Sequence, residues 1–259
     1  MTISYTGAKL MQGLSTDTKP STVPNGTIFN ETDTGKTYWH SGSNGFPTFI
    51  DNFGQYADQT SADASWVSND TAKIRVNITN DNIDFNISDD SAMKNIAYDL
   101  TTISDTAFMV RFKLNFSTLT DATNSYFYIG LSNGQATDVN SAQDFIGMLL
   151  HPNSNTYASR DTDGTSPSAD QVGENAVSWS PATDTDYFFE IERTSATAYI
   201  VRRYSNSTYV TVSDSSAGVC VSTTATLRYF RIIGNNDTNN GSIIGTLDDI
   251  KFKNGVTAW

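Results

Sequence analysis

Cysteine, histidine and positive charge are all scarce in this chain of 259 residues. The single cysteine, Cys220, excludes a disulfide within the chain, and its valine neighbours predict a small buried thiol on a strand. The two histidines, His40 and His151, offer neither zinc-ligand spacing nor a recognisable nucleophile–histidine pair. A formal charge of −12 without a basic patch argues against a nucleic-acid partner and against an anionic membrane surface.

Long apolar runs are also missing. No stretch of the chain is apolar for long enough to span a membrane, so no membrane insertion is expected. The first ten residues lack a charged segment followed by an apolar one, so no signal peptide is predicted and synthesis in a host cytoplasm is expected. Only 17% of the residues are charged, while Ser, Thr and Asn are abundant. This composition favours an outward-facing β-sandwich over a metabolic enzyme.

What the chain does have is polar–apolar alternation with the period of a β-strand. The longest run predicts a strand in which Phe108, Val110, Phe112, Leu114 and Phe116 share one face. Shorter patterns predict strands at Asp51–Tyr56, Tyr126–Leu131, Tyr187–Arg193, Ala198–Tyr204, Tyr209–Val212 and Thr246–Lys253. About a dozen such strands, with no long helical period, predict an all-β, two-sheet antiparallel sandwich over residues 47–259.

Residues 1–46 have a different character and predict an N-terminal arm. Pro20 and Pro24 bracket a stiff, extended connector. A β-prone run at Ile28–Phe29, a turn at 33–36 and a return strand at Thr37–His40 predict a β-hairpin. A two-stranded hairpin is marginally stable alone, so we expect it to dock on the sandwich, on a second copy or on another protein.

The arm resembles a small module that recurs in tail and fibre proteins of tailed phages and archaeal viruses. The resemblance rests on Leu14–Pro20, Val23–Gly26, Phe29–Gly35 and the aromatic pair Tyr38-Trp39. It implies a protein on the virion surface, with attachment or oligomerisation as the role of the arm. The expected partners are other virion proteins and further copies of this chain.

The remaining chain resembles concanavalin A-like lectin/glucanase and laminin-G-like jelly rolls. The resemblance is carried by Asp51–Tyr56, Phe108–Leu114, Phe127–Ser132, Tyr187–Arg193 and Gly245–Phe252. It implies that the first and last strands of the domain pair with each other. Because this is a pattern of strand order, it informs the fold more than the function.

Glu190 and Glu192 are the best candidates for catalysis. Residues two apart on a strand point to the same face, which places these carboxylates roughly 6–7 Å apart, near the separation used in glycoside cleavage. Laminarinase-like relatives carry Glu-x-Asp-x-x-Glu on this strand, whereas this chain has Glu190-Ile-Glu-Arg-Thr-Ser195. We therefore expect no enzyme activity, and we interpret the pair as part of a solvated sheet face near Arg193 and Arg202.

Two groups of aspartates predict structural calcium. Asp161 and Asp163 begin Asp161-Thr-Asp-Gly-Thr-Ser166, which is similar to the start of a calcium loop. The later ligands of such a loop are missing, so a plain polar turn is the favoured alternative. Asp51 would meet Asp248 and Asp249 if the first and last strands are neighbours.

Glycan binding requires exposed aromatic rings, and the candidates are Trp66, Tyr157 and Trp179. The alternative is that both tryptophans plug the edge of the sandwich. Together these observations predict a virion surface protein that reinforces the particle or contacts host glycans through many weak sites. A stand-alone carbohydrate-binding module and a glycoside hydrolase or polysaccharide lyase are the alternatives.

Overall fold

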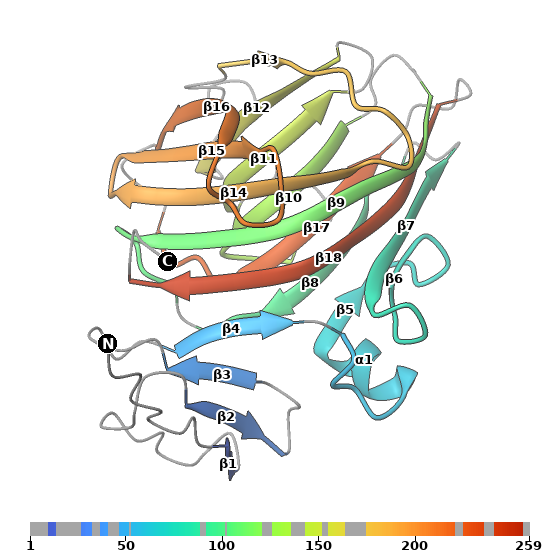
Figure 1. Cartoon of the computed structure of the whole chain (residues 1–259), viewed down its shortest axis with the longest axis vertical. Helices are drawn as coiled ribbons and strands as arrows, with labels where there is room; N and C mark the ends of the chain where they lie inside the picture. Colours follow the sequence, from blue (N-terminus) through green and yellow to red (C-terminus); the bar gives the residue numbers. More distant parts are fainter. Residues whose placement is uncertain are drawn as a thin grey trace, which may run out of the picture.

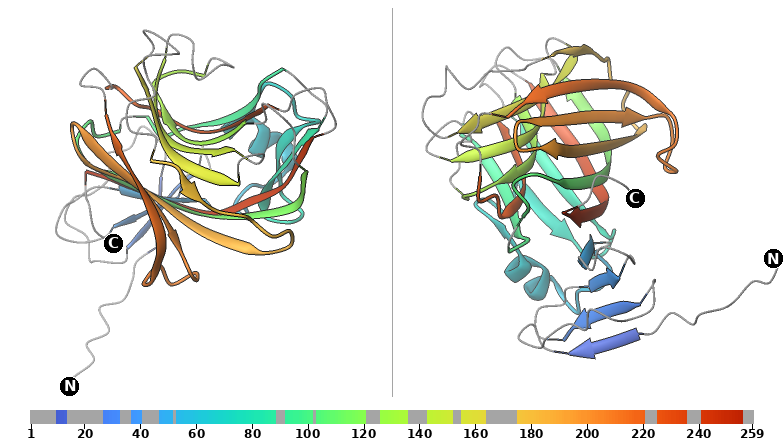
Figure 2. Two further views of the ribbon diagram at one scale, coloured as in Figure 1. Left: turned by 90° about the horizontal axis from the view of Figure 1, so that it is seen from above. Right: turned by 90° about the vertical axis from the view of Figure 1, so that its left-hand side faces the viewer.

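The structure, a computed structural model, describes residues 10–13, 27–32, 37–40, 47–51, 53–88, 92–101, 103–120, 126–135, 143–151, 155–163, 175–220, 225–235 and 241–255. Within these residues the chain forms two sheets that face each other across one core (Figure 1, Figure 2). The strands pair in antiparallel fashion, except that β1 and β2 run parallel. The predicted all-β sandwich is therefore confirmed.

The larger sheet has eleven strands within the described residues. Nine of them follow one another in the order β1 (Leu10–Gly13), β2 (Ile28–Glu31), β3 (Thr37–His40), β4 (Pro47–Asp51), β18 (Ser242–Asn254), β9 (Phe108–Thr120), β14 (Asp186–Ser195), β15 (Ala198–Tyr204) and β16 (Val212–Val219). The other two, β7 (Asn82–Ser88) and β6 (Ile74–Asn77), continue the sheet from the first half of β18.

The smaller sheet has seven strands within the same residues. Their order is β13 (Val177–Ser178), β12 (Thr156–Asp163), β11 (Asp144–His151), β10 (Tyr126–Ser132), β17 (Tyr229–Asn235), β8 (Lys94–Asp99) and β5 (Trp66–Ser68). Seen from above, the two sheets stack as two layers (left panel of Figure 2).

The core lies between the sheets and follows the alternation of the sequence. On β9, the predicted row from Phe108 to Phe116 is fully buried, while the residues between face the other side of the sheet. Cys220 is buried as predicted, but it lies just after β16 rather than on a strand. Burial raises the pKa of its thiol to about 12. This cysteine is therefore a small apolar residue of the core rather than a nucleophile.

The first and last strands of the sandwich pair as predicted, because Asp51 on β4 lies opposite Ile250 on β18. The predicted strand Asp51–Tyr56 is wrong beyond its first residue. Phe53 has a left-handed backbone with φ 59°, and its N–H donates to the carboxylate of Asp51, so the chain turns there.

The predicted hairpin is present as β2 and β3, with Ile28 opposite Trp39. It joins the sandwich through backbone pairing, because β3 pairs with β4 and β4 pairs with β18. Figure 1 shows these blue strands continuing the larger sheet below the sandwich. The predicted boundary between residues 46 and 47 remains a prediction, and Pro20 and Pro24 lie outside the described residues.

One short helix, α1 (Gln59–Ser65), was not predicted from the sequence. Its start carries a recognisable signal, since the carboxylate of Asp58 accepts a hydrogen bond from the N–H of Ser61 at 2.8 Å. No helix within the described residues is long and apolar enough to cross a membrane.

Candidate functional site

A groove of about 550 Å³ lies on the outer face of the larger sheet, where β6, β7, β18 and β9 lie side by side. Its volume falls within the range of roughly 300–1,000 Å³ that is usual for small-molecule sites. We call it the Asn115 groove. The polar side chains that line it include Gln59, Arg75, Asn77, Asn86, Asn115 and Thr246.

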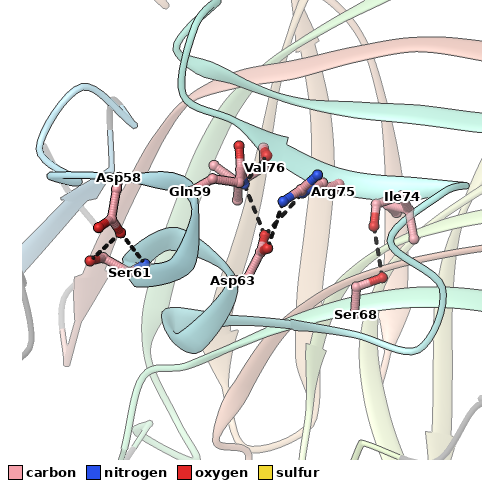
Figure 3. A network of polar contacts seen from close by, with 8 residues as sticks. All are labelled: Asp58, Gln59, Ser61, Asp63, Ser68, Ile74, Arg75 and Val76. Carbon is pink, nitrogen blue, oxygen red and sulfur yellow. Dashed lines mark hydrogen bonds and ion pairs between the residues drawn. The ribbon is translucent and has the colours of Figure 1, made fainter.

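Helix α1 forms one wall of the Asn115 groove and is tied to β6 (Figure 3). The Nε and Nη2 atoms of Arg75 donate to the two carboxylate oxygens of Asp63, at 3.2 and 2.8 Å. Gln59 donates to the carbonyl of Val76 at 2.6 Å and to Asp63 at 2.9 Å. These contacts hold the wall in place although the side chains of Arg75 and Asp63 are 44% and 32% exposed.

The charged groups of the groove are matched internally. Although burial acts to raise the pKa of Asp63, the hydrogen bonds from Arg75 and Gln59 outweigh it and lower that pKa. The amide of Asn77 donates to the carboxylate of Asp84 at 2.6 Å. The ammonium of Lys73 donates to the carbonyl of Ser88 at 3.1 Å.

Strand alternation explains why polar groups meet in this groove. On β7, Ile83, Phe85 and Ile87 point into the core and are almost completely buried. Their neighbours Asp84 and Asn86 therefore point outward. The same rule turns Asn115 outward on β9 and Thr246 outward on β18, and strand pairing sets these two residues opposite each other.

Gly245 permits the close approach of these strands. A Cβ at this position would lie 2.0 Å from the carbonyl oxygen of Asn115 and 2.9 Å from the ring of Phe85. Only glycine avoids that collision, so the floor of the groove depends on it.

The chemistry that the groove offers is hydrogen bonding. Its described lining contains amides, hydroxyls and paired charges, and none of its lining residues is Cys, His or Glu. Sequence reasoning missed this site because it searched for carboxylate pairs and exposed aromatic rings. The available signal was the run of Asn, Ser and Thr at outward positions of β6, β7, β9 and β18.

Glu190 and Glu192 lie on the same outer face, on β14, but they are buried. The carboxylate of Glu190 accepts from Arg111 and Arg202 at 2.7 Å each and from the Tyr204 hydroxyl at 2.9 Å. Arg202 also donates to Glu192. Burial acts to lower the pKa of Arg202, but its hydrogen bonds to the two glutamates outweigh it and raise that pKa.

The predicted solvated face is therefore wrong, and the reason is the loop of residues 205–211, which we call the Tyr209 loop. These residues do not form the first part of the predicted strand Tyr209–Val212. Figure 1 shows the β15–β16 connection turning back over β14, where Tyr209 contacts Phe188. The Tyr209 hydroxyl donates to the carbonyl of Phe112 at 3.1 Å, and Arg111 lies 4.5 Å from its ring centroid. Arg193, which was expected beside the glutamates, instead bonds the carbonyls of Ser195 and Ala196.

The three predicted glycan-binding aromatics are all buried, so that prediction is wrong. Trp66 is 1% exposed, Tyr157 0% and Trp179 5%. Tyr157 and Trp179 pack edge to face in the core with their centroids 5.8 Å apart. The alternative, in which the two tryptophans fill the sandwich, describes their positions better.

Asp51 is fully buried and its carboxylate is occupied by the chain itself. It accepts hydrogen bonds from the Phe53 N–H, Gln55, the Tyr56 hydroxyl at 2.7 Å and the Trp66 indole at 2.8 Å. Burial raises the pKa of Asp51 against the lowering effect of these donors. Since four donors already surround the two oxygens, Asp51 does not fit the predicted calcium site.

The other predicted calcium ligands are not gathered either. Asp248 pairs with Lys113 at 2.9 Å, and Asp249 pairs with Lys251 at 2.8 Å. Asp161 is buried on β12 rather than in a loop, while the side chain of Asp163 and residues 164–166 lie outside the described residues. Within the described part of the chain, no group of three or more acidic, His or Cys side chains could hold a metal ion.

Two facing antiparallel sheets, with the last strand beside the first, define a concanavalin A-like sandwich, and the comparisons agree. No protein-family model and no curated protein sequence matches the chain. The Ca²⁺-bound exoplasmic/lumenal domain of VIP36 aligns with a TM-score of 0.54 at 13% identity, covering 82% of this chain and 91% of that chain. The metal-free carbohydrate recognition domain of Emp46p aligns with a TM-score of 0.53 at 11% identity, covering 80% and 95%. At such identities the likeness shows the fold alone.

Proposed function

We propose that this protein is a non-enzymatic glycan-binding protein that holds sugar hydroxyl groups in the Asn115 groove. The observation that carries the proposal is the groove itself, a hollow lined by amides and hydroxyls on a lectin-like sandwich. Amide and hydroxyl groups both donate and accept hydrogen bonds, as sugar hydroxyls do.

The surroundings of the glutamates support a binding protein over a glycoside hydrolase or lyase. Glu190 is 1% exposed and has three donors on its carboxylate. A general acid or base must come within hydrogen-bond reach of substrate, and these three donors, together with the Tyr209 loop that packs on Arg111, stand in the way. The absence of enzyme activity remains part of the proposal.

We place the protein on a virion surface, where the arm attaches it or joins copies of it. The pairing of the arm with β4, which in turn pairs with β18, supports this setting, because it makes the arm an extension of the displayed domain. Light scattering of the full-length protein tests it: a discrete oligomer is expected. A monomer would favour a stand-alone carbohydrate-binding module.

Two observations raise the question of calcium. The aspartate groups of the sequence predict a structural ion, and the exoplasmic/lumenal domain of VIP36 has a Ca²⁺-bound form. The described aspartates do not fit a site, so the groove is proposed to work without the ion. Melting curves with calcium and with EDTA test a structural ion: a saturable rise in Tm would support it, and identical curves would reject it.

The test of glycan binding is a glycan array followed by titration of each hit. Thr246→Arg places a long side chain in the Asn115 groove. Thr194→Arg is the matched control, on the exposed end of β14. We expect Thr246→Arg to weaken binding at least tenfold while Thr194→Arg binds like the wild type. Equal binding by both variants would place the site elsewhere, and no binding by the wild type would reject the function.

A further inference from the structure

We propose that the Asn115 groove selects neutral, hydroxyl-rich glycans and discriminates against acidic ones. This inference rests on the proposed function and specifies its ligand class. It follows from the hydrogen bonds and ion pairs that the charged and polar side chains of the groove make within the chain.

The cations of the groove are engaged by the chain itself. Arg75 presents two donors to Asp63, which is the geometry that would otherwise capture a ligand carboxylate. Lys73 directs its ammonium to the carbonyl of Ser88. A sugar carboxylate would have to displace Asp63 from Arg75 before it gained a bidentate partner.

The anions of the groove repel an acidic ligand. Asp84 lines the groove and accepts a hydrogen bond from Asn77, while Asp63 lies beside the groove and accepts from Arg75. Asp186 lies beside the groove, where it accepts from Asn115 at 2.8 Å. A uronate or sialate would therefore meet the carboxylate of Asp84 in the groove, with Asp63 and Asp186 beside it, on a chain whose formal charge is −12.

The neutral groups complement hydroxyls. Asn115 donates its amide N–H to Asp186, which leaves its carbonyl oxygen as an acceptor toward the groove. Asn86 accepts from the Ser88 hydroxyl at 2.9 Å, which leaves its amide N–H groups as donors. Adjacent donors and acceptors suit a hydroxyl, which uses both roles at once.

Stacking contributes little to this recognition. Phe85 is the one aromatic residue among the described lining residues, and it is only 1% exposed. Each hydrogen bond to a sugar hydroxyl replaces one to water and so adds only modestly to the affinity, and a single site should therefore bind weakly. Display of several copies would compensate for that weakness.

The experiment is an array of matched oligosaccharide pairs, in which the same neutral chain is printed with and without a terminal sialic or uronic acid. The wild-type protein is applied at low and at high salt. We expect the neutral member to bind about fivefold more strongly than its acidic partner, since like-charge repulsion at a partly exposed site is worth about 1 kcal/mol. Neutral binding should persist at high salt.

Two variants test whether Asp84 causes the discrimination against acidic glycans. Asp84→Asn should lower the ratio of neutral to acidic binding, whereas Thr194→Arg should leave that ratio at its wild-type value. Equal or stronger binding of acidic members, lost at high salt, would overturn the selectivity while leaving glycan binding intact. No binding by any glycan would overturn the proposed function and this inference together.

Discussion

The outer face of the larger sheet holds two polar regions that share strand β9 and differ in what covers them. Around Asn115, the amides and hydroxyls line an open groove. Around Arg111, four residues along the same strand, two buried glutamates and two partly exposed arginines lie beneath the Tyr209 loop. The comparison teaches that outward polar residues of a strand become a site or a structural cluster according to the loop that lies above them.

The charges of the two regions differ accordingly. In the groove, Arg75 and Asp63 form an exposed pair, which contributes little because water screens it. In the cluster, Glu190 is shielded from water, and removing one partner leaves the others uncompensated. Four sets of measurements test this contrast.

The largest effect is expected for Glu190→Gln. Loss of this charge leaves Arg111 and Arg202 facing each other, and we expect about 3 kcal/mol less stability, at the low end for a broken buried pair because both arginines are partly exposed. Urea unfolding measures the change. Glu192→Gln, which removes a single arginine contact, should lose less. A loss below about 1 kcal/mol for Glu190→Gln would show that the cluster behaves like a surface pair.

The second-largest expected effect is a difference in stability between two substitutions of Tyr209, whose backbone is left-handed with φ 55°. Tyr209→Ala and Tyr209→Gly both remove the ring, but alanine retains a conformational penalty of about 1 kcal/mol that glycine does not pay. Thermal and urea unfolding should find the glycine variant more stable by that amount. If alanine were equal or better, the loop would not depend on the left-handed conformation.

A pH dependence is expected from Tyr204, which donates to Glu190. Burial, reinforced by the nearby Glu190 charge, raises its pKa from 10.0 to about 12. A phenol whose pKa is higher in the folded state contributes stability below pH 10, and this is lost as the pH rises through about 12. Stability measured from pH 9 to 12 should therefore fall less steeply in Tyr204→Phe. Parallel curves for wild type and variant would contradict the assignment.

The smallest effect is expected in the groove. Asp63→Asn breaks the exposed pair with Arg75 and should lower stability by less than about 1 kcal/mol. The difference from wild type should shrink further at high salt. A loss as large as that of Glu190→Gln would mean that α1 depends on this pair, and the contrast between the two regions would fail.

Much of the fold could be predicted because a strand that buries one face in a core alternates apolar and polar residues in the sequence. The row from Phe108 to Phe116 was predicted and is buried, and strand β15 has the predicted bounds Ala198–Tyr204. Predictions failed where a local hydrogen bond or a left-handed residue overrode the pattern. Phe53 and Tyr209 are two such residues. Bulky residues rarely adopt a positive φ, and the neighbouring sequence does not indicate that either residue does so.

Site predictions failed for a related reason. Trp66, Tyr157 and Trp179 sit in turn-rich sequence, which suggested exposure, yet the aromatic cluster between the sheets includes all three. Asp51 was expected to hold calcium, but Tyr56 and Trp66 bring their own donors to it. In each case the deciding partner lies elsewhere in the fold, where sequence spacing gives no information about it.

By itself, the sequence determined the class of fold, because period-two alternation specifies which face of each strand is buried. The pairing of the two ends was expected from the resemblance to concanavalin A-like jelly rolls. It also determined that Asn86, Asn115 and Thr246 would point away from the core. Tertiary structure alone decided that these three residues meet in an open groove while Glu190 lies covered. The physical reason is that alternation is a property of one strand, whereas exposure depends on strands and loops that are distant in the chain.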